Sequence, residues 1–136
     1  MQDEQMKALA KDFLGMSEED IAKVTPEQER QYKNTMENMN KFRLVAEVKK
    51  ARYCAGGLQV GQKIVFDGVQ IDKNASDCPL CVGAIAPLER ALAVYLDRCG
   101  HNRDVAAPME AVYCIDPGFD AGGLGTVMLE VRVEPR

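Results

Sequence analysis

The stretch that decides the fold reads CPLCVGAIAPLERALAVYLDRC and covers residues 78–99. Apolar residues recur in it at three- and four-residue intervals, which is the spacing of one face of an α-helix. They are Ile85, Leu88, Leu92 and Tyr95 or Leu96. The pattern predicts a helix over residues 82–97, which Cys99 and Gly100 follow. Pro87 either kinks the first turns of this helix, because it removes a hydrogen bond, or marks the true start of the long segment.

Segments on both sides of this helix alternate between apolar and polar residues, as half-buried strands do. The strand expected over residues 42–54 places Phe42, Leu44, Ala46 and Val48 on one face. The strand expected over residues 125–134 does the same with Val127, Leu129, Val131 and Val133. Shorter runs over residues 63–66 and 109–116 predict two further strands. Residues 69–77 show no such pattern, and we expect a loop there.

The order of these elements predicts the fold class. Two strands, one helix and two strands, with the other helices confined to the N-terminus, indicate an α+β fold rather than a doubly wound parallel sheet. We expect two hairpins that form one antiparallel β-β-α-β-β sheet, covered on one face by the helix after residue 81. The chain then divides into a helical N-terminal arm, residues 1–41, and an α+β cysteine-containing domain, residues 42–136.

The N-terminal arm has clear helix boundaries. Gly15 is a natural stop for a first helix. Thr25 and Gln28 fit a capping box, and Pro26 suits the first helical position, so a second helix is expected over residues 26–40. Its single narrow apolar stripe consists of Tyr32, Met36 and Met39. Because the rest of this helix is polar, it is suited to lie across a domain or against a partner. We therefore expect self-association or a protein partner through helix 26–40.

Composition and charge exclude several classes of protein. The chain has 136 residues, 46% hydrophobic and 28% charged, which is typical of one globular domain. Its net charge of −4 argues against nucleic-acid binding. No apolar run approaches the ~20 residues that span a membrane, and the N-terminus lacks the features of a secretory signal. We therefore expect a cytoplasmic protein with reduced thiols and with no nucleic-acid or membrane partner.

The five cysteines include a spacing that resembles a zinc site. Cys78, Cys81, Cys99 and His101 follow the pattern C-x2-C-x17-C-x-H. The predicted helix separates the first two from the last two, because it rises ~1.5 Å per residue. Zinc holds its ligands at ~2.0–2.3 Å, so these four residues should not share one ion. We expect His101 to be an exposed residue after the helix.

A different set of cysteines can meet. Cys54 ends the first predicted strand, Cys114 lies near the end of the third, and Cys78 and Cys81 begin the helix. Strand ends and a helix start commonly line one edge of an α+β domain. We therefore expect these four side chains to approach one another.

Three interpretations of this set are open. The cysteines are small hydrophobic residues of the core, where this residue type is common. Alternatively they perform thiol chemistry, because a helix start stabilises a thiolate, although the neighbouring Asp77 opposes this effect. The third interpretation is a metal site, in which soft thiolates bind zinc or an iron–sulfur cluster. Cys78, which Pro79 follows, is the thiol that we expect to be most reactive.

Three short motifs suggest a relationship. They comprise Cys54, Gly57, Gly61 and Phe66, then Cys78 and Pro79, then Cys114, Asp116 and Pro117. Over residues 42–134 the chain thereby resembles a family of small uncharacterised prokaryotic proteins with the pattern Cys-x-x-Gly-x-x-x-Gly, Cys-Pro and Cys-x-Asp-Pro. The resemblance implies a site at the three matching cysteines, with Cys81 as an addition. The function of this family is unassigned, so the resemblance implies no reaction.

The sequence thus predicts a small cytosolic domain with a cysteine-lined site. The site either binds a metal or reacts through its thiols, with Cys78 as the reactive one; its expected metal ligands are Cys54, Cys78, Cys81 and Cys114. The rival prediction is a non-catalytic accessory protein that oligomerises or docks to a subunit through its N-terminal helices, with structural cysteines. A third prediction is a ligand pocket between sheet and helix, lined by Phe66, Tyr113 and Phe119.

Overall fold

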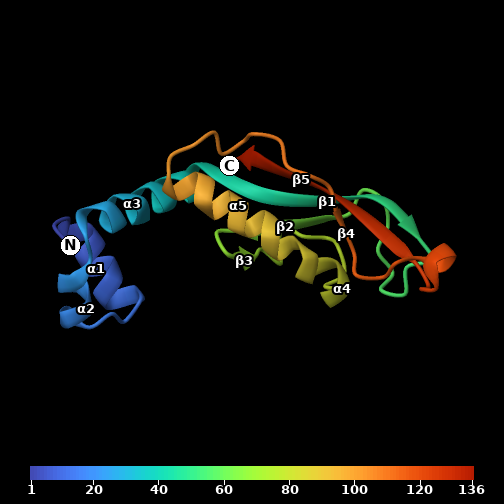
Figure 1. The fold of residues 1–136 in the computed structure, drawn as a ribbon, viewed down its shortest axis with the longest axis horizontal. Coiled ribbons are helices and arrows are strands. Elements are labelled where there is room, and N and C mark those ends of the chain that lie inside the picture. Colours follow the sequence, from blue (N-terminus) through green and yellow to red (C-terminus); the bar gives the residue numbers. More distant parts are fainter.

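A computed structural model describes residues 1–136. Its centre is a five-stranded antiparallel sheet with the strand order β3-β2-β1-β5-β4 (Figure 1). The strands are β1 (Phe42–Arg52), β2 (Lys63–Asp67), β3 (Gln70–Ile71), β4 (Val112–Tyr113) and β5 (Thr126–Pro135). The helical segments are α1 (Glu4–Ala8), η1 (Leu9–Phe13), α2 (Glu18–Lys23), α3 (Pro26–Lys41), α4 (Val82–Ile85), η2 (Ala86–Leu88), α5 (Glu89–Gly100) and η3 (Phe119–Ala121). The fold is therefore α+β, as the order of elements predicts.

The long strands β1 and β5 lie side by side in the middle of the sheet. Their register runs from Phe42 opposite Pro135 to Arg52 opposite Thr126, with a bulge beside Val48. Successive side chains of a strand point to opposite faces of the sheet, so every second residue of β1 and β5 lies on the inner face. These buried residues are Leu44, Ala46 and Val48 of β1 and Val127, Leu129, Val131 and Val133 of β5. The inner faces that the sequence predicts for both strands are confirmed.

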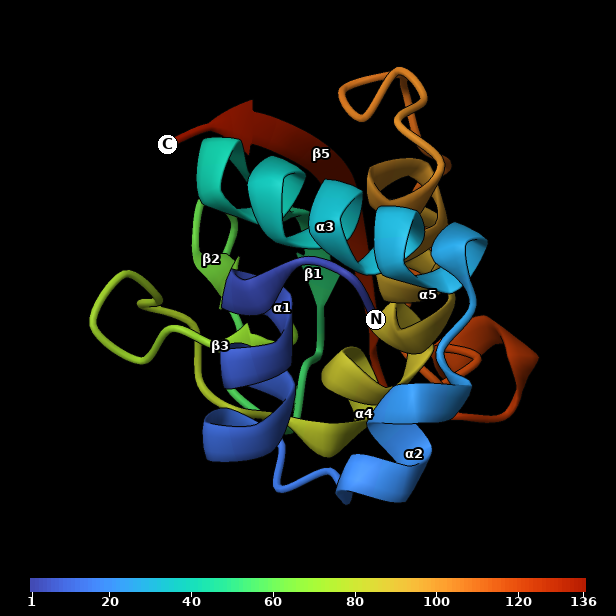
Figure 2. The same cartoon turned by 90° about the vertical axis from the view of Figure 1, so that its left-hand side faces the viewer.

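Residues 82–100 form an almost continuous helix made of α4, η2 and α5, and the sheet curls around it (Figures 1 and 2). Its buried stripe consists of Ala84, Leu88, Ala91, Tyr95 and Cys99. Pro87 lies in η2, a single 3-10 turn, because it lacks the N–H that a continuous α-helix needs there. The predicted helix is confirmed, but it continues through Cys99, which we expected beyond its end.

The N-terminal arm packs against one end of this helix (Figure 2). The predicted capping box is present at the start of α3, where Thr25 and Gln28 exchange hydrogen bonds. The contact between α3 and α5 is polar: the side-chain amides of Asn34 and Asn38 donate to the carbonyls of Gly100 and Cys99. These two residues could not be predicted from the sequence, because polar side chains on a polar helix carry no periodic signal.

Three predicted boundaries are wrong. Residues 69–77 contain β3, which pairs with β2; a strand of two residues is too short to show alternation. The strand expected over residues 109–116 is only two residues long, because β4 is an edge strand that pairs with β5 alone. β1 ends at Arg52, since Tyr53 has a φ of 49° that turns the chain out of the sheet.

No helix has both the length and the apolar composition needed to cross a bilayer.

Candidate functional site

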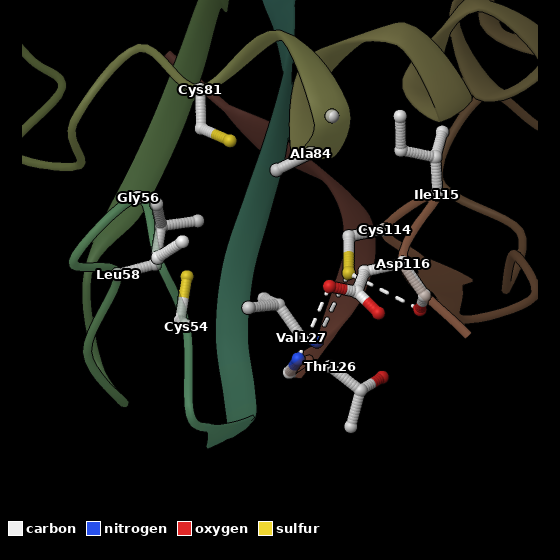
Figure 3. Close-up of a pocket in the computed structure, with 13 residues that line it drawn as sticks. Cys54, Gly56, Leu58, Cys81, Ala84, Cys114, Ile115, Asp116, Thr126 and Val127 are labelled. Carbon is white, nitrogen blue, oxygen red and sulfur yellow. Dashed lines mark hydrogen bonds between the residues drawn. The ribbon is translucent and has the colours of Figure 1, made fainter. Parts of the chain in front are cut away.

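Three of the five cysteines line one small pocket at the end of the molecule away from the N-terminal arm (Figures 1 and 3). Cys54 follows β1, Cys81 precedes α4 and Cys114 follows β4. The volume of the pocket is about 160 Å³. Its other lining residues are Ala55, Gly56, Leu58, Gly83, Ala84, Ile115, Asp116, Gly125, Thr126 and Val127. Folding therefore brings together thiols from three distant parts of the chain.

Cys81 occupies the N-cap position of α4 and is half-buried. Two glycines border its sulfur. A methyl group on Gly56 would lie 3.1 Å from the Sγ of Cys81, and one on Gly83 would lie 3.8 Å from it. The backbone of Gly56 does not have a positive φ, so its conformation does not require glycine. The absence of a side chain here matters because it leaves room beside the sulfur of Cys81. The two glycines leave this sulfur open to the pocket.

Cys54 and Cys114 have different surroundings. Figure 3 shows the sulfurs of Cys54 and Cys81 on the side of the pocket where Leu58 lies, with Cys114 on the other side beside Val127. The backbone N–H of Val127 donates to the Sγ of Cys114 at 3.2 Å, and this sulfur donates to the carbonyl of Asp116 at 3.8 Å. The thiol of Cys114 is therefore held by two hydrogen bonds, and no hydrogen bond involves the sulfur of Cys54 or of Cys81.

Cys78 does not line the pocket. It is the most buried of the four predicted site cysteines, with 7% of its surface exposed, and it belongs to the hydrophobic core. Burial, together with the charge of Asp77 and the nearness of Cys54 and Cys81, raises the pKa of Cys78 to about 11. Near neutral pH this side chain is therefore a neutral thiol.

Asp116 is a pocket residue for which the sequence predicts a place in the turn Asp116-Pro117-Gly118 rather than a binding role. Its carboxylate accepts the backbone N–H groups of Gly118 at 2.9 Å, Leu124 at 3.0 Å and Gly125 at 3.1 Å. These hydrogen bonds, that of Gly118 foremost, hold the pKa of Asp116 below its ordinary value. The signal that could have revealed it is an aspartate before Pro-Gly with three glycines close behind.

Cys99 and His101 lie in a different part of the molecule. Cys99 is completely buried among the helix and sheet residues of the core, and burial raises its pKa. His101 is an exposed residue after α5, as expected, and its ring contacts Asp97 one turn earlier in the helix. The rejection of the C-x2-C-x17-C-x-H pattern is supported by this placement, because a continuous helix separates the two pairs.

The side chains do not form a ready metal site. No three histidine, cysteine, aspartate or glutamate side chains lie close enough together to hold a metal ion, and all five cysteines are free thiols. Asp116, the one carboxylate at the pocket, directs its oxygens at backbone amides. The donors present therefore do not fit zinc or an iron–sulfur cluster as they stand, and we derive no step through a metal.

The residues of the third prediction do not share a cavity with the thiols. Phe66 is buried in the core, whereas Tyr113 and Phe119 are exposed. Phe119 instead contacts Tyr53 edge to face, with ring centres 6.2 Å apart. None of the three lines the pocket of Figure 3.

No family model matches the chain, and neither a curated protein nor a solved structure matches it. Any function must therefore be argued from the pocket and its thiols.

Proposed function

We propose that this chain is a thiol-reactive protein whose pocket exchanges two of its thiols with a small disulfide. Cys81 makes the first attack and Cys54 completes the exchange. The observation that carries this proposal is the meeting of thiols from three distant segments in one pocket. The reactive role that the sequence predicts for Cys78 passes to Cys81 in this proposal, because a buried thiol with a raised pKa is a poor nucleophile.

The proposed exchange has two steps. The thiolate of Cys81 attacks one sulfur of the disulfide, the sulfur–sulfur bond breaks, and the leaving thiolate takes up a proton from solvent. A mixed disulfide on Cys81 results. The thiol of Cys54 then loses its proton and attacks the Sγ of Cys81, which forms a Cys54–Cys81 disulfide and releases the second substrate thiol. Two protein thiols are oxidised and one substrate disulfide is reduced to two thiols.

The surroundings of the sulfurs support this pairing. Cys81 is half-buried and lines the pocket, and the glycines beside its Sγ carry no side chain that would cover it. The sulfur of Cys54 lies on the same side of the pocket and makes no hydrogen bond that would have to break. The sulfur of Cys114 is engaged by the amide of Val127, which makes it a wall of the pocket rather than an attacking group.

Mapping of thiol adducts tests the proposal. The reduced full-length protein is treated with a limiting amount of a small disulfide, quenched at intervals and digested for mass spectrometry. We expect the first adduct on Cys81 and a later Cys54–Cys81 disulfide. The variant Cys81→Ser should lose both products. The control variant Cys99→Ala removes a buried thiol far from the pocket and should react as the wild type does.

The same experiment has results that contradict the proposal. Equal labelling of all five cysteines, or labelling only after unfolding, would show that the pocket has no thiol reactivity of its own. A first adduct on Cys78 would show that Cys78, the residue that the sequence favours, makes the first attack instead of Cys81. Metal analysis of anaerobically purified protein addresses the metal alternative, and stoichiometric zinc or iron would replace the exchange with a metal-binding function.

A second candidate function is docking through the N-terminal arm. A groove of about 320 Å³ lies between the first helices of the arm and α3. It is lined by Met1, Met6, Leu9, Ala10, Leu14, Met16, Tyr32, Thr35 and Met36. Methionine adapts its shape to an incoming partner, and such side chains are common at binding surfaces. Phe13 precedes the groove residue Leu14 in the sequence and leaves 80% of its surface exposed, so it is a further exposed apolar side chain of the arm.

Self-association through this groove is tested by solution mass. We expect the variant Met36→Glu to dissociate an oligomer that the wild type forms, and Glu27→Lys on the same helix to leave it intact. A point variant is preferable to deletion of residues 1–40, because deletion would also remove the contacts of Asn34 and Asn38 with α5. A wild-type protein that is monomeric at high concentration would contradict this form of docking.

A further inference from the structure

The walls of the thiol pocket also indicate which molecules can enter it. We propose that the pocket admits small, uncharged, apolar thiol reagents and disfavours anionic ones. This inference rests on the thiol reactivity proposed above and names the substrate class of the same site. It follows from three properties of the pocket: its charge, its size and the apolar side chains exposed there.

The charge of the pocket is negative. Asp116 is the one charged residue among those that line it, and hydrogen bonds from backbone amides keep its carboxylate ionised. No lysine, arginine or histidine lines the pocket. The nearest arginine in sequence, Arg52, pairs with Asp120 at 2.8 Å and lies over the ring of Tyr53. An anion would therefore lose its hydration, find no cation and face a carboxylate.

The size of the pocket limits its occupant. Its volume of about 160 Å³ is well below the roughly 300–1,000 Å³ of sites that hold drug-sized molecules. Leu58, Ala84 and Val127 form apolar walls around the sulfurs. A methyl group on Gly56 would lie 3.1 Å from the Sγ of Cys81 and would narrow the approach to it. The pocket therefore fits one short apolar group attached to the reacting sulfur.

Exposed apolar side chains also lie at the pocket and next to Cys81 in the sequence. Ile115 lines the pocket and leaves 74% of its surface exposed, and Val82, next to Cys81, leaves 77% exposed. Leu80, which precedes Cys81 in the sequence, is also exposed. These side chains favour the approach of an apolar molecule over a strongly hydrated one.

Methanethiosulfonates of different charge test the inference; the anionic and the cationic reagent match each other in size, so their comparison isolates charge. In each reaction the thiolate of Cys81 attacks the sulfenyl sulfur, a disulfide forms, and methanesulfinate leaves with the electron pair of the broken sulfur–sulfur bond. The thiol proton passes to solvent. The probes are the neutral propyl reagent, the anionic 2-sulfonatoethyl reagent and the cationic 2-(trimethylammonio)ethyl reagent. Each labelling rate at Cys81 is divided by the rate of the same reagent with the unfolded chain.

We expect the normalised rate of the propyl reagent to exceed that of the sulfonate by about tenfold or more. The cation should fall between them, because the negative charge of Asp116 attracts it. High salt should reduce the difference between anion and cation. The variant Gly56→Ala should slow the propyl reagent, since the added methyl group crowds the sulfur. The control Cys99→Ala should leave all three rates unchanged.

Three results would overturn the inference in different ways. Fast labelling of Cys81 with equal normalised rates for neutral and anionic reagents would leave the thiol function intact and remove the selectivity. If no reagent labels Cys81 faster than it labels Cys78 or Cys99, the pocket has no thiol reactivity of its own. The proposed function and the proposed selectivity would then both be wrong. A faster reaction of the sulfonate than of the propyl reagent would show that a cation reaches the pocket.

Discussion

The side-chain amide of Asn38 donates a hydrogen bond of 2.9 Å to the backbone carbonyl of Cys99. Asn38 belongs to the N-terminal arm and is buried, with 7% of its surface exposed. Cys99 lies in the last turn of α5, where carbonyl groups have no partner within the helix. Asn34 satisfies the next carbonyl, that of Gly100, at 3.0 Å. The arm thus caps the C-terminal end of the central helix.

The first prediction concerns this cap. Asn38→Ala should lower the free energy of unfolding by about 0.5–1.5 kcal/mol. The buried carbonyl of Cys99 loses this donor and keeps only the longer hydrogen bond from the backbone N–H of Asn102, at 3.3 Å. Urea unfolding followed by circular dichroism measures the change. Asn40→Ala provides the control, since Asn40 is exposed on the same helix. Equal midpoints for the two variants would mean that the arm does not stabilise α5.

The second prediction concerns Glu29, a buried carboxylate in the arm. It accepts the backbone N–H groups of Asp3 and Gln2, and these hydrogen bonds lower its pKa. A lowered pKa gives stability that is present above the ordinary carboxylate pKa and is lost as the pH falls through the lowered value. Glu29→Gln should therefore speed hydrogen exchange at residues 2 and 3 at neutral pH.

The pH dependence provides the control for Glu29. In the wild type the protection of these amides should decrease on acidification, whereas in Glu29→Gln it should be low throughout. Glu27→Gln removes an exposed carboxylate on the same helix and should behave as the wild type does. Protection that is independent of pH in the wild type would show that the carboxylate does not fix the chain start.

The parts of the fold that could be predicted are those with strong periodicity. The stripe through Leu88 and Tyr95 and the alternation in β1 and β5 depend on local spacing, and the structure contains all of them. β3 was missed, because a strand of two residues is too short to show alternation, although it pairs with β2 directly across the turn at Gly68 and Val69. The apolar stripe of α3 could be predicted, but not its two uses: Met39 packs on the core, and Met36 lines the groove in the arm.

The candidate site could be predicted in part for a related reason. Strand ends and a helix start meet at one edge, so Cys54, Cys81 and Cys114 reach the same pocket. The burial of each cysteine could not be predicted. Cys78 and Cys81 are three residues apart, yet Cys78 belongs to the core and Cys81 lines the pocket. Packing of the whole domain decides that difference. The role of Asp116 depends on amides of residues up to nine positions away.

The third prediction concerns the loop that Asp116 organises. Asp116→Asn replaces one acceptor oxygen by an N–H donor; in the place of Oδ2 this donor would face the amides of Leu124 and Gly125. We expect faster hydrogen exchange at these two amides. Asp120→Asn is the control, because it breaks only a surface ion pair with Arg52, and such pairs contribute little. Unchanged exchange in Asp116→Asn would mean that the glycines alone determine the loop conformation.

The last prediction uses the raised pKa of Cys78. In the folded state this thiol ionises at about 11, against an ordinary value of 9.0. A raised pKa of an acidic group gives stability that is complete below the ordinary value and is lost as the pH rises toward the folded value. Between pH 8 and 11 the wild type should therefore lose roughly 2 kcal/mol more stability than Cys78→Ala. Denaturant unfolding under reducing conditions at several pH values measures both curves.

The comparison isolates Cys78 from the other buried acids. Burial also raises the pKa of Tyr95 and of Cys99, and both residues are present in wild type and variant, so their contribution cancels in the difference. The stability curves should converge as the pH rises, since the alanine variant has no thiol to ionise. Parallel curves would place Cys78 in contact with solvent. In that case the reason for assigning the first attack to Cys81 would fail, and adduct mapping alone would decide between the two thiols.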